Sequence, residues 1–278
     1  MAKKPKKPTN EMSFLDHLEE LRWVLVRSSA AVVIMACITY FFCDYIFDTI
    51  IFGPTDPSFI TYRFFCEASH YVGFADSICI TELPFIIQNT EMEGQVNIFV
   101  WTCITAGFIL SFPYILWQFW KFISPALYEK ERKNAKTFIF IASLLFFLGV
   151  LFGYYVIVPM SVNFLATFSI SSVVKNQFNI DSYIGMVKTA VIASGLYFEL
   201  PIILYFLTKL GLVTPAFLRK YRKYAIVIVL IIAAIVTPPD VVSQITVAIP
   251  MLLIYEASIW MSAVVVRNKK RDEQKQTS

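Results

Sequence analysis

Charged residues are scarce in this 278-residue chain, in which Lys, Arg, Asp and Glu together make up 16% of the sequence. A soluble domain typically has about 25% charged residues and about 45–50% apolar ones. Here 57% of the residues are hydrophobic and the mean hydropathy is +0.63, which excludes an ordinary soluble domain. The composition therefore predicts a protein that has a lipid bilayer as its solvent.

Histidine and cysteine are also scarce, with two and five residues respectively. No Cys-x-x-Cys or Cys/His pair has the spacing of metal ligands, so we expect neither a metal site nor a cofactor. The sequence contains no Gly-x-x-x-x-Gly-Lys-Ser/Thr motif, which argues against an ATP site. An intramembrane enzyme is disfavoured as well, because no nucleophile–base pair is apparent and we expect His17 and His70 on opposite sides of the membrane.

The N-terminal segment, residues 1–12, is short, basic and proline-containing. It lacks the long, Ser- and Arg-rich, acid-poor composition of an organelle transit peptide, and no small-residue cleavage site follows the first apolar stretch. We therefore expect the first hydrophobic segment to be a retained anchor in a bacterial or archaeal plasma membrane.

Six apolar stretches are candidates to span the membrane, because about 20 apolar residues are needed to cross roughly 30 Å of hydrocarbon. The expected helices cover approximately residues 23–43, 96–119, 138–158, 188–208, 224–237 and 241–262. We expect Pro159 to end the third helix, and Glu199 and Pro201 to interrupt the fourth. The sequence thus predicts an all-α polytopic membrane protein with six transmembrane helices, the last two of them short.

Basic residues alternate between the connections of these helices. They gather before the first helix, between the second and third, between the fourth and fifth, and after the sixth, whereas residues 44–95 contain Arg63 against eight acidic residues. The positive-inside rule then places both termini in the cytoplasm. We expect a six-helix transmembrane domain over residues 13–266, with basic cytoplasmic tails at 1–12 and 267–278.

The expected fifth helix is too short for an ordinary bilayer. Its apolar core, Ala225 to Val236, would be about 18 Å long, against roughly 30 Å of hydrocarbon. Two explanations stay open: the bilayer thins locally beside this helix, or other parts of the protein cover it so that lipid never contacts it.

The first outer loop, residues 44–95, is unusually long and contains three prolines and several apolar runs. We expect it to form a small external cap rather than a free linker. Cys66 and Cys79 lie in this loop on the oxidising side of the membrane, where they can form a disulfide, although two free thiols are the alternative. Cys37 and Cys103 are expected to be ordinary buried apolar residues.

Close helix packing is predicted in the third helix. Gly149 and Gly153 are four residues apart, and this small-residue spacing allows another helix to approach closely.

The segment 13–22 has the features of an amphipathic helix start, with Ser13 as N-cap and Asp16 at the third position. Apolar residues then recur at helical spacing and lead directly into the first spanning helix. Glu19 and Glu20 are acids on a face otherwise rich in Lys and Arg. Their spacing alone favours charge balance with Arg22 and nearby lysines, and a binding role is the alternative.

Several motifs follow one another in a fixed order along the chain. The N-terminal segment contains His17-Leu18-x-Glu20-Leu21-Arg22. The second connection contains Ser111-Phe112-Pro113, Gln118-x-Trp120-x-Phe122, Pro125-x-Leu127-Tyr128 and Glu131-Arg132. Further on come Phe198-Glu199-x-Pro201, Thr237-Pro238-Pro239-Asp240, Ser243-Gln244, Ala248-Ile249-Pro250 and Tyr255-Glu256. Each motif is weak alone, but their order on this topology resembles the TatC family.

The resemblance implies a receptor that binds the twin-arginine motif of signal peptides at the cytoplasmic surface. Glu20 and Glu131 match the two acids that form this site in the family. The chemistry agrees with that role, because a planar guanidinium can pair bidentately with a carboxylate and an ammonium cannot. The resemblance also implies export of folded proteins, driven by the proton motive force, across a bacterial plasma (inner) membrane.

Five further positions follow from the same resemblance. Glu199 and Gln244 are expected to be functional polar residues within the membrane, and Gln244 is either a hydrogen-bonding partner of Glu199 or a contact for other subunits. Phe122, Pro125 and Asp240 are expected to have structural or partner-contact roles, and Asp240 can equally be the N-cap of the sixth helix.

The expected partners are TatA- and TatB-like single-span subunits, the signal peptides of folded precursors, and the lipid bilayer, in a hetero-oligomer with several copies and no nucleic acid. One alternative comes from a different functional class, a small proton-coupled transporter with Glu199 as its proton site. An ionisable residue inside a membrane segment supports such a reading. Internal repeats or paired broken helices, which a transporter would predict, are absent from the sequence pattern.

Overall fold

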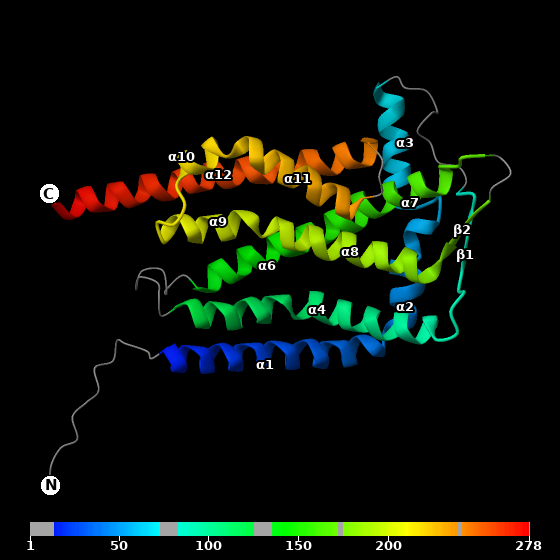
Figure 1. Ribbon diagram of the computed structural model, residues 1–278, viewed down its shortest axis with the longest axis horizontal. Coiled ribbons are helices and arrows are strands. Elements are labelled where there is room, and N and C mark those ends of the chain that lie inside the picture. The colour runs from blue at the N-terminus through cyan, green and yellow to red at the C-terminus, as the bar shows by residue number, and fades with distance from the viewer. Residues whose placement is uncertain (1–13, 73–82, 125–134, 172–174, 238–240, 278) are drawn as a thin grey trace, which may run out of the picture. The chain divides into compact units, whose positions relative to one another are not determined.

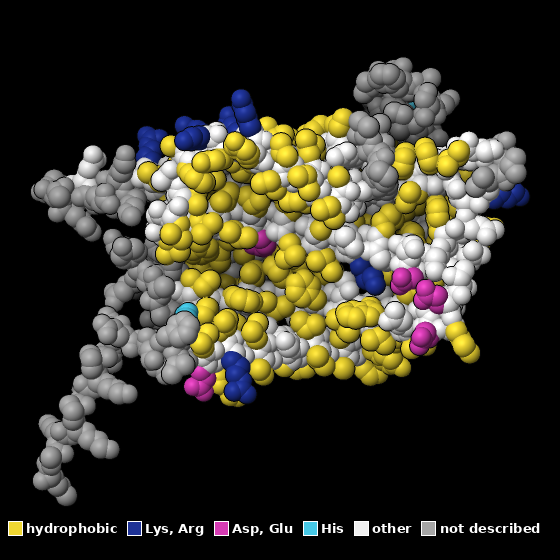
Figure 2. Space-filling view, in the orientation of Figure 1, with side chains coloured by type: hydrophobic (Ala, Val, Ile, Leu, Met, Phe, Trp, Pro, Cys, Tyr) yellow, Lys and Arg dark blue, Asp and Glu magenta, His cyan; other side chains and the backbone are white. Residues whose placement is uncertain are grey.

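The computed structural model describes residues 14–72, 83–124, 135–171, 175–237 and 241–277. Two compact units make up the chain: Met1–Tyr40 with Cys103–Ser143, and Phe41–Thr102 with Leu144–Ser278. We refer to them below as the first and second unit. Hydrophobic side chains dominate the face shown in Figure 2. Large apolar residues such as Val33 and Trp260 are exposed on the surface of the chain. Such a surface suits a lipid environment.

Five helical stretches of the described residues are long and apolar enough to cross a membrane. They are His17–Tyr40, Gly94–Ile123, Lys136–Thr167, Ile180–Lys209 and Ser243–Asn268. The predicted helical, polytopic membrane protein is therefore confirmed. The expected fifth helix is present as α11 (Arg222–Val236), whose 15 residues correspond to about 22 Å. Its crossing of the bilayer stays a prediction.

The first unit is built from α1 (Phe14–Tyr40) and parts of α4 (Gly94–Ile123) and α6 (Ala135–Phe152). Helix α1 begins well before residue 23, because the predicted amphipathic turn joins the spanning helix without a break. Helices α1 and α4 lie side by side (Figure 1), and a Cβ on Gly107 would come within 2.6 Å of the Ala36 backbone nitrogen. Only glycine permits this approach.

In the second unit the third helix continues past Pro159, so the predicted stop at this residue is wrong. Helix α6 passes through a π-turn, η4 (Gly153–Ile157), into α7 (Val158–Thr167). Pro159 lies in the first turn of α7, where a missing backbone N–H removes no hydrogen bond that α7 itself needs. The π-turn changes the register just before the proline and so lets the chain remain helical.

The predicted close approach at Gly149 and Gly153 occurs inside the chain. A Cβ on Gly149 would lie 2.6 Å from the Ser194 carbonyl oxygen, and one on Gly153 would lie 2.7 Å from the Ala190 carbonyl oxygen. Both carbonyls belong to α8 (Ile180–Phe198). These glycines therefore pack the third and fourth helices together.

The fourth helix begins at Ile180, earlier than expected, where Asn179 is the N-cap and accepts a hydrogen bond from the Asp181 backbone at 3.2 Å. The expected interruption is confirmed, since α8 ends at Phe198 and α9 (Leu200–Lys209) follows Glu199. The short α10 (Pro215–Lys220) and α11 then lead to α12 (Val241–Thr277). Helix α12 runs far beyond residue 262, because its polar C-terminal part is rich in good helix formers.

The described parts of the long connection between α1 and α4 contain several short elements, in line with the expectation that this segment is not a free linker. It contains α2 (Cys43–Tyr45), the π-turn η1 (Ile46–Ile51), η2 (Gly53–Thr55), α3 (Ile60–Val72) and β1 (Phe85–Gln88). The Tyr62 hydroxyl of α3 donates to the carbonyl oxygens of Pro54 and Pro159, at 2.8 and 3.2 Å. Burial raises the pKa of this hydroxyl above its usual range, so it stays protonated and able to donate. The segment is therefore fastened to α7.

The expectation of a purely helical chain needs one correction. Strand β1 pairs in parallel with β2 (Asn176–Asn179), with Phe85 opposite Asn176. Four-residue strands leave little trace in a sequence pattern, which is why this pairing was not predicted. Cys66 is disulfide-bonded, whereas Cys37, Cys43 and Cys103 are thiols that take part in no disulfide. Its predicted partner, Cys79, lies outside the described residues. Cys103 is buried as expected, but Cys37 is exposed.

Candidate functional site

A cavity of about 350 Å³ lies in the first unit, between the first turns of α1 and the last turns of α4. Its lining consists of Glu19, Glu20, Trp23, Val24, Arg27, Gln118 and Lys121. Four of these seven residues carry a formal charge at neutral pH, which makes the cavity unusual in so apolar a chain. It contains Glu20, one of the two predicted receptor acids.

Within the described part of the chain, Arg222 and Glu256 form an ion pair, whereas Glu19 and Glu20 have no ion-pair partner. Glu19 is exposed and Glu20 is half-buried. The ion pair with Arg22, one of the partners that spacing alone favoured, is therefore absent from the described residues, and the N-terminal lysines lie outside them. Two carboxylates thus remain in one cavity with their acceptor oxygens available.

The two cations of the cavity face tryptophan rings instead of carboxylates. The Lys121 ammonium lies 3.9 Å from the ring centroid of Trp117, and the Arg27 guanidinium carbon lies 6.0 Å from that of Trp23. In each case the tryptophan precedes the cation by one helical turn, a spacing at which side chains meet. An exposed cation–π contact contributes about 0.5–1 kcal/mol, and an exposed ion pair contributes about 0–1 kcal/mol. A tryptophan ring can therefore compete with a carboxylate for a nearby cation.

Gln118 is a member of this site that the sequence reasoning did not single out. Its side chain is 3% exposed, and its Oε1 atom has no hydrogen-bond partner. Leaving a buried amide oxygen unpaired is unfavourable by about 1–3 kcal/mol. Gln118 is three residues before Lys121 and lies inside one of the family-like motifs. Its place in that motif is the sequence signal that could have identified it as a member of the site.

Phe122 stacks on His17, with ring centroids 4.3 Å apart and an interplanar angle of 20°. This contact joins the first turns of α1 to the end of α4, and it gives Phe122 a structural position beside the cavity. Trp120 stacks on Phe138 at 4.6 Å and joins α4 to α6. Glu131 and Pro125 lie outside the described residues, so their place at this site stays a prediction.

Glu199 lies in the second unit, at the junction of α8 and α9. Its side chain is 6% exposed and its Oε1 atom has no hydrogen-bond partner. Gln244 donates from Nε2 to the Leu230 carbonyl oxygen at 3.2 Å, and within the described residues no hydrogen bond joins it to Glu199. Of the two expected roles for Gln244, only the contact with other subunits stays open. Asp240 lies outside the described residues.

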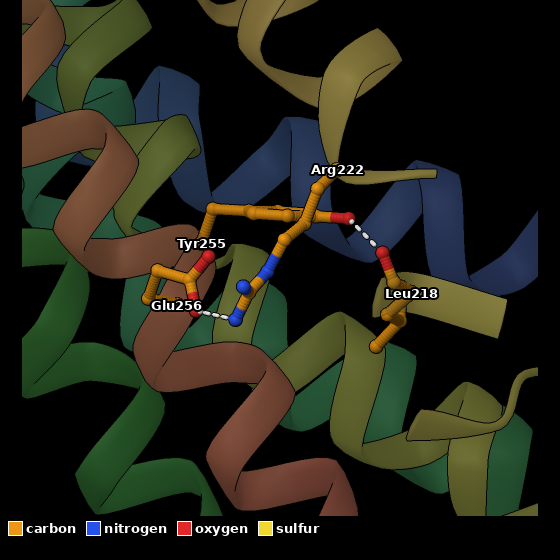
Figure 3. Close-up of polar contacts among 4 residues, drawn as sticks. All are labelled: Leu218, Arg222, Tyr255 and Glu256. Atoms are coloured by element: carbon orange, nitrogen blue, oxygen red, sulfur yellow. Dashed lines mark hydrogen bonds and ion pairs between the residues drawn. The ribbon is translucent and has the colours of Figure 1, made fainter. Parts of the chain in front are cut away.

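Glu256 has a different environment from the other acids. Arg222, at the start of α11, donates to Glu256 on α12 at 2.5 Å, and both side chains are about half exposed (Figure 3). Beside this pair, the Tyr255 hydroxyl donates to the Leu218 carbonyl oxygen at 3.0 Å. These contacts fasten α10 and the start of α11 to α12.

A second cavity, of about 460 Å³, lies in the second unit. Its lining is Val162, Leu165, Gln177, Phe178, Asn179, Ser182, Tyr183, Met186, Thr189, Ile235, Val236 and Thr237. No carboxylate or cation is among these lining residues, so this cavity has no means of selecting a charged ligand. For a cationic ligand, the cavity in the first unit is the better candidate.

Comparisons with known proteins agree on one family. A family model described as "Sec-independent protein translocase protein (TatC)" matches residues 16–250. The protein named "Sec-independent protein translocase protein TatC" from Blattabacterium sp. subsp. Periplaneta americana is 44% identical over 270 residues, which cover 95% of this chain and 100% of the relative. The protein of the same name from Aquifex aeolicus is 35% identical over 261 residues, covering 93% and 98% of the two chains.

A solved structure gives the same result at the level of the fold. The crystal structure of a "Twin Arginine Translocase Receptor- TatC" superposes with a TM-score of 0.70 and 34% sequence identity. The superposition covers 90% of this chain and 99% of that chain.

Proposed function

Because this chain belongs to the TatC family, we propose that it is the signal-peptide receptor subunit of a twin-arginine protein translocase. It is a multi-pass membrane protein and a transport component rather than an enzyme. The alternative of a small proton-coupled transporter is set aside, because the family is one of protein translocases.

The observation that carries the receptor site is the pair of unpaired carboxylates in the first-unit cavity. Glu19 and Glu20 face a space of about 350 Å³, and the cations of that space are engaged by tryptophan rings. An arginine side chain entering the cavity would find carboxylate oxygens that need not first release another cation. Glu20 is the receptor acid supported by this geometry, and Glu131 is its proposed counterpart from the segment after α4.

Selection of arginine over lysine follows from the acceptor geometry. A guanidinium has five N–H donors in a planar fork and can bind two acceptors at once, whereas an ammonium is a compact point charge. Gln118 can add a third acceptor beside the two carboxylates, since its amide oxygen has no partner. A cavity with several acceptors therefore favours the ligand with the larger number of directed donors.

We place both termini, and with them the first-unit cavity, on the cytoplasmic side of a bacterial plasma membrane. The alternation of basic residues along the chain supports this orientation. In this arrangement α11 is the fifth crossing, from the connection between α9 and α10 inside to the connection between α11 and α12 outside, and α12 is the sixth. Residues 1–12 and 267–278 are then cytoplasmic, residues 13–266 form the membrane domain, and the segment 44–95 forms an outer cap.

Single-span TatA- and TatB-like subunits are the proposed partners, in a hetero-oligomer with several copies that uses the proton motive force. Glu199 supports a partner contact, because a carboxyl group buried without a hydrogen bond on a membrane helix is unfavourable unless another molecule supplies a donor. Gln244 and Asp240 are proposed to contribute to the same assembly step.

The test is site-specific crosslinking of signal peptides to the protein in membranes, with Arg-Arg or Lys-Lys at the motif. We expect Glu20→Gln to weaken binding of the Arg-Arg peptide about 10- to 100-fold, because a charge-assisted hydrogen bond is lost. Glu91→Gln is the matched control, since Glu91 is an exposed carboxylate that does not line the cavity. Crosslinking that is indifferent to the arginines and to Glu20 would refute the receptor assignment.

A further inference from the structure

The first-unit cavity contains cations of its own that could compete with a cationic ligand for its carboxylates. Lys121 and Arg27 line the same cavity as Glu19 and Glu20, so each could act as an internal counterion for these carboxylates. A receptor whose acids were already paired with its own cations would bind a cationic peptide weakly. In the structure Lys121 lies over the Trp117 ring and Arg27 over the Trp23 ring, and among the described residues neither cation forms an ion pair with these carboxylates.

We propose that Trp117 is a positioning residue of the receptor site: it holds Lys121 away from Glu19 and Glu20 and so keeps these carboxylates open to the arginines of the ligand. Trp23 has the same role toward Arg27 at a longer distance. The inference rests on the proposed receptor function of the cavity and adds to it the reason why its acids are free.

The geometry favours Lys121 as the main competitor. Its ammonium is 3.9 Å from the Trp117 ring centroid, within the range of a strong cation–π contact, whereas the Arg27 contact of 6.0 Å is at the limit of that range. A lysine ammonium on its flexible stem turns readily toward a carboxylate once the ring is removed. Lys121 is exposed, so packing does not fix its position.

The ring of Trp117 is itself held in place by a neighbour. Tyr114, one turn earlier on α4, contacts Trp117 edge to face with ring centroids 5.6 Å apart. Tyr114, Trp117 and Lys121 thus form a continuous ladder along one side of α4. Such edge-to-face pairs are a favoured aromatic geometry, so the face presented to Lys121 is defined before any ligand arrives.

The size of the effect follows from a two-state competition. If Lys121 pairs with a carboxylate, only the remaining open fraction of receptors can bind, and the apparent dissociation constant rises by the inverse of that fraction. The cation–π contact and the ion pair are of similar strength, about 0.5–1 kcal/mol each, so removing the ring is expected to lower the open fraction about two- to fourfold.

The experiment measures binding of an Arg-Arg signal peptide to the full-length protein in nanodiscs. We expect Trp117→Leu to weaken binding about two- to fourfold, and Trp117→Phe, which keeps an aromatic face, to weaken it less. The double variant Trp117→Leu/Lys121→Gln is expected to return to wild-type affinity, because the competing cation is gone. Trp101→Leu is the control, as Trp101 is an exposed tryptophan of α4 that does not line the cavity.

A loss of binding in Trp117→Leu that Lys121→Gln does not restore would overturn the proposal and assign Trp117 a merely structural role. Unchanged binding in Trp117→Leu would overturn it as well. Glu20→Gln, measured in parallel, separates the role of Trp117 from the receptor function of the cavity. If Glu20→Gln abolishes binding while Trp117→Leu does not alter it, only this inference fails; if neither alters it, the receptor site fails too.

Discussion

The carboxylates of the first-unit cavity and the carboxylate of Glu256 in the second unit have opposite relations to the cations near them. Glu256 is paired with Arg222 at 2.5 Å, in a contact that fastens two helices together. Glu19 and Glu20 share a cavity with Lys121 and Arg27, yet these cations face tryptophan rings. An acid that has its own arginine serves the fold, whereas acids kept apart from nearby cations are available to a ligand.

Glu199 forms a third case in this comparison. It has neither a cation nor a hydrogen bond at Oε1, and it is almost fully buried. Glu19 and Glu20, the acids proposed to bind the peptide, line the first-unit cavity, whereas Glu199 lines neither that cavity nor the one in the second unit. The three environments predict three different consequences of removing a carboxylate.

The largest effect is expected when both open acids of the first unit are removed together. Glu19→Gln/Glu20→Gln should weaken binding of an Arg-Arg peptide by about 100-fold or more, because the ligand loses its charge-assisted acceptors and the cavity becomes net positive. Fluorescence anisotropy with a labelled peptide measures this loss. A double variant no weaker than Glu20→Gln alone would show that Glu19 belongs to the solvated surface and not to the site.

Removing Glu199 should separate transport from recognition. We expect Glu199→Ala to reduce export of a folded reporter at least about tenfold while peptide binding changes less than twofold, since the residue lies in the other unit and is buried. Export assays and peptide crosslinking on the same membranes give the two readouts. Parallel losses of export and of peptide crosslinking would place Glu199 in the recognition step.

A smaller and more specific effect is expected at Gln118. Replacing it by Leu removes a buried amide oxygen that has no partner, so the thermal midpoint should stay equal or rise. Peptide binding should nevertheless fall about fivefold, a value typical of one lost hydrogen bond, and preference for Arg-Arg over Lys-Lys should narrow. A lower midpoint together with unchanged peptide preference would assign Gln118 to the packing of α1 against α4.

Much of the fold follows from the sequence because bilayer thickness and helical periodicity leave few alternatives. The five long apolar helices were predicted from these two constraints, and the interruption of the fourth was predicted because Glu199 and Pro201 fall inside an apolar stretch. The stop at Pro159 was wrong because a proline in the first turn of a helix is tolerated, and a π-turn cannot be recognised from composition. The pairing of β1 with β2 was missed because it joins four-residue strands far apart in the chain.

The candidate site was only partly accessible to sequence reasoning. The family-like motifs identified Glu20, but spacing alone favoured pairing of Glu19 and Glu20 with Arg22. Which cation an acid contacts depends on tertiary geometry, and here Trp117 and Trp23 decide it through contacts that no acid–base spacing reveals. Gln118 was overlooked for a related reason, since burial of a polar residue and the absence of its partner are properties of the folded chain.

The smallest effect is expected at the ion pair between Arg222 and Glu256. Both side chains are about half exposed, and an exposed ion pair contributes about 0–1 kcal/mol to stability. Glu256→Gln should therefore lower the free energy of unfolding by no more than about 1 kcal/mol and leave peptide affinity unchanged. The charge-swapped variant Arg222→Glu/Glu256→Arg should recover the small loss, because it restores an ion pair at the same place. Thermal unfolding in detergent and the anisotropy assay measure the two quantities. Glu256→Gln could instead cause a marked loss of peptide binding that the charge-swapped variant recovers. That result would mean that the Arg222–Glu256 pair shapes the receptor site, and it would contradict the assignment of Glu256 to a purely structural role.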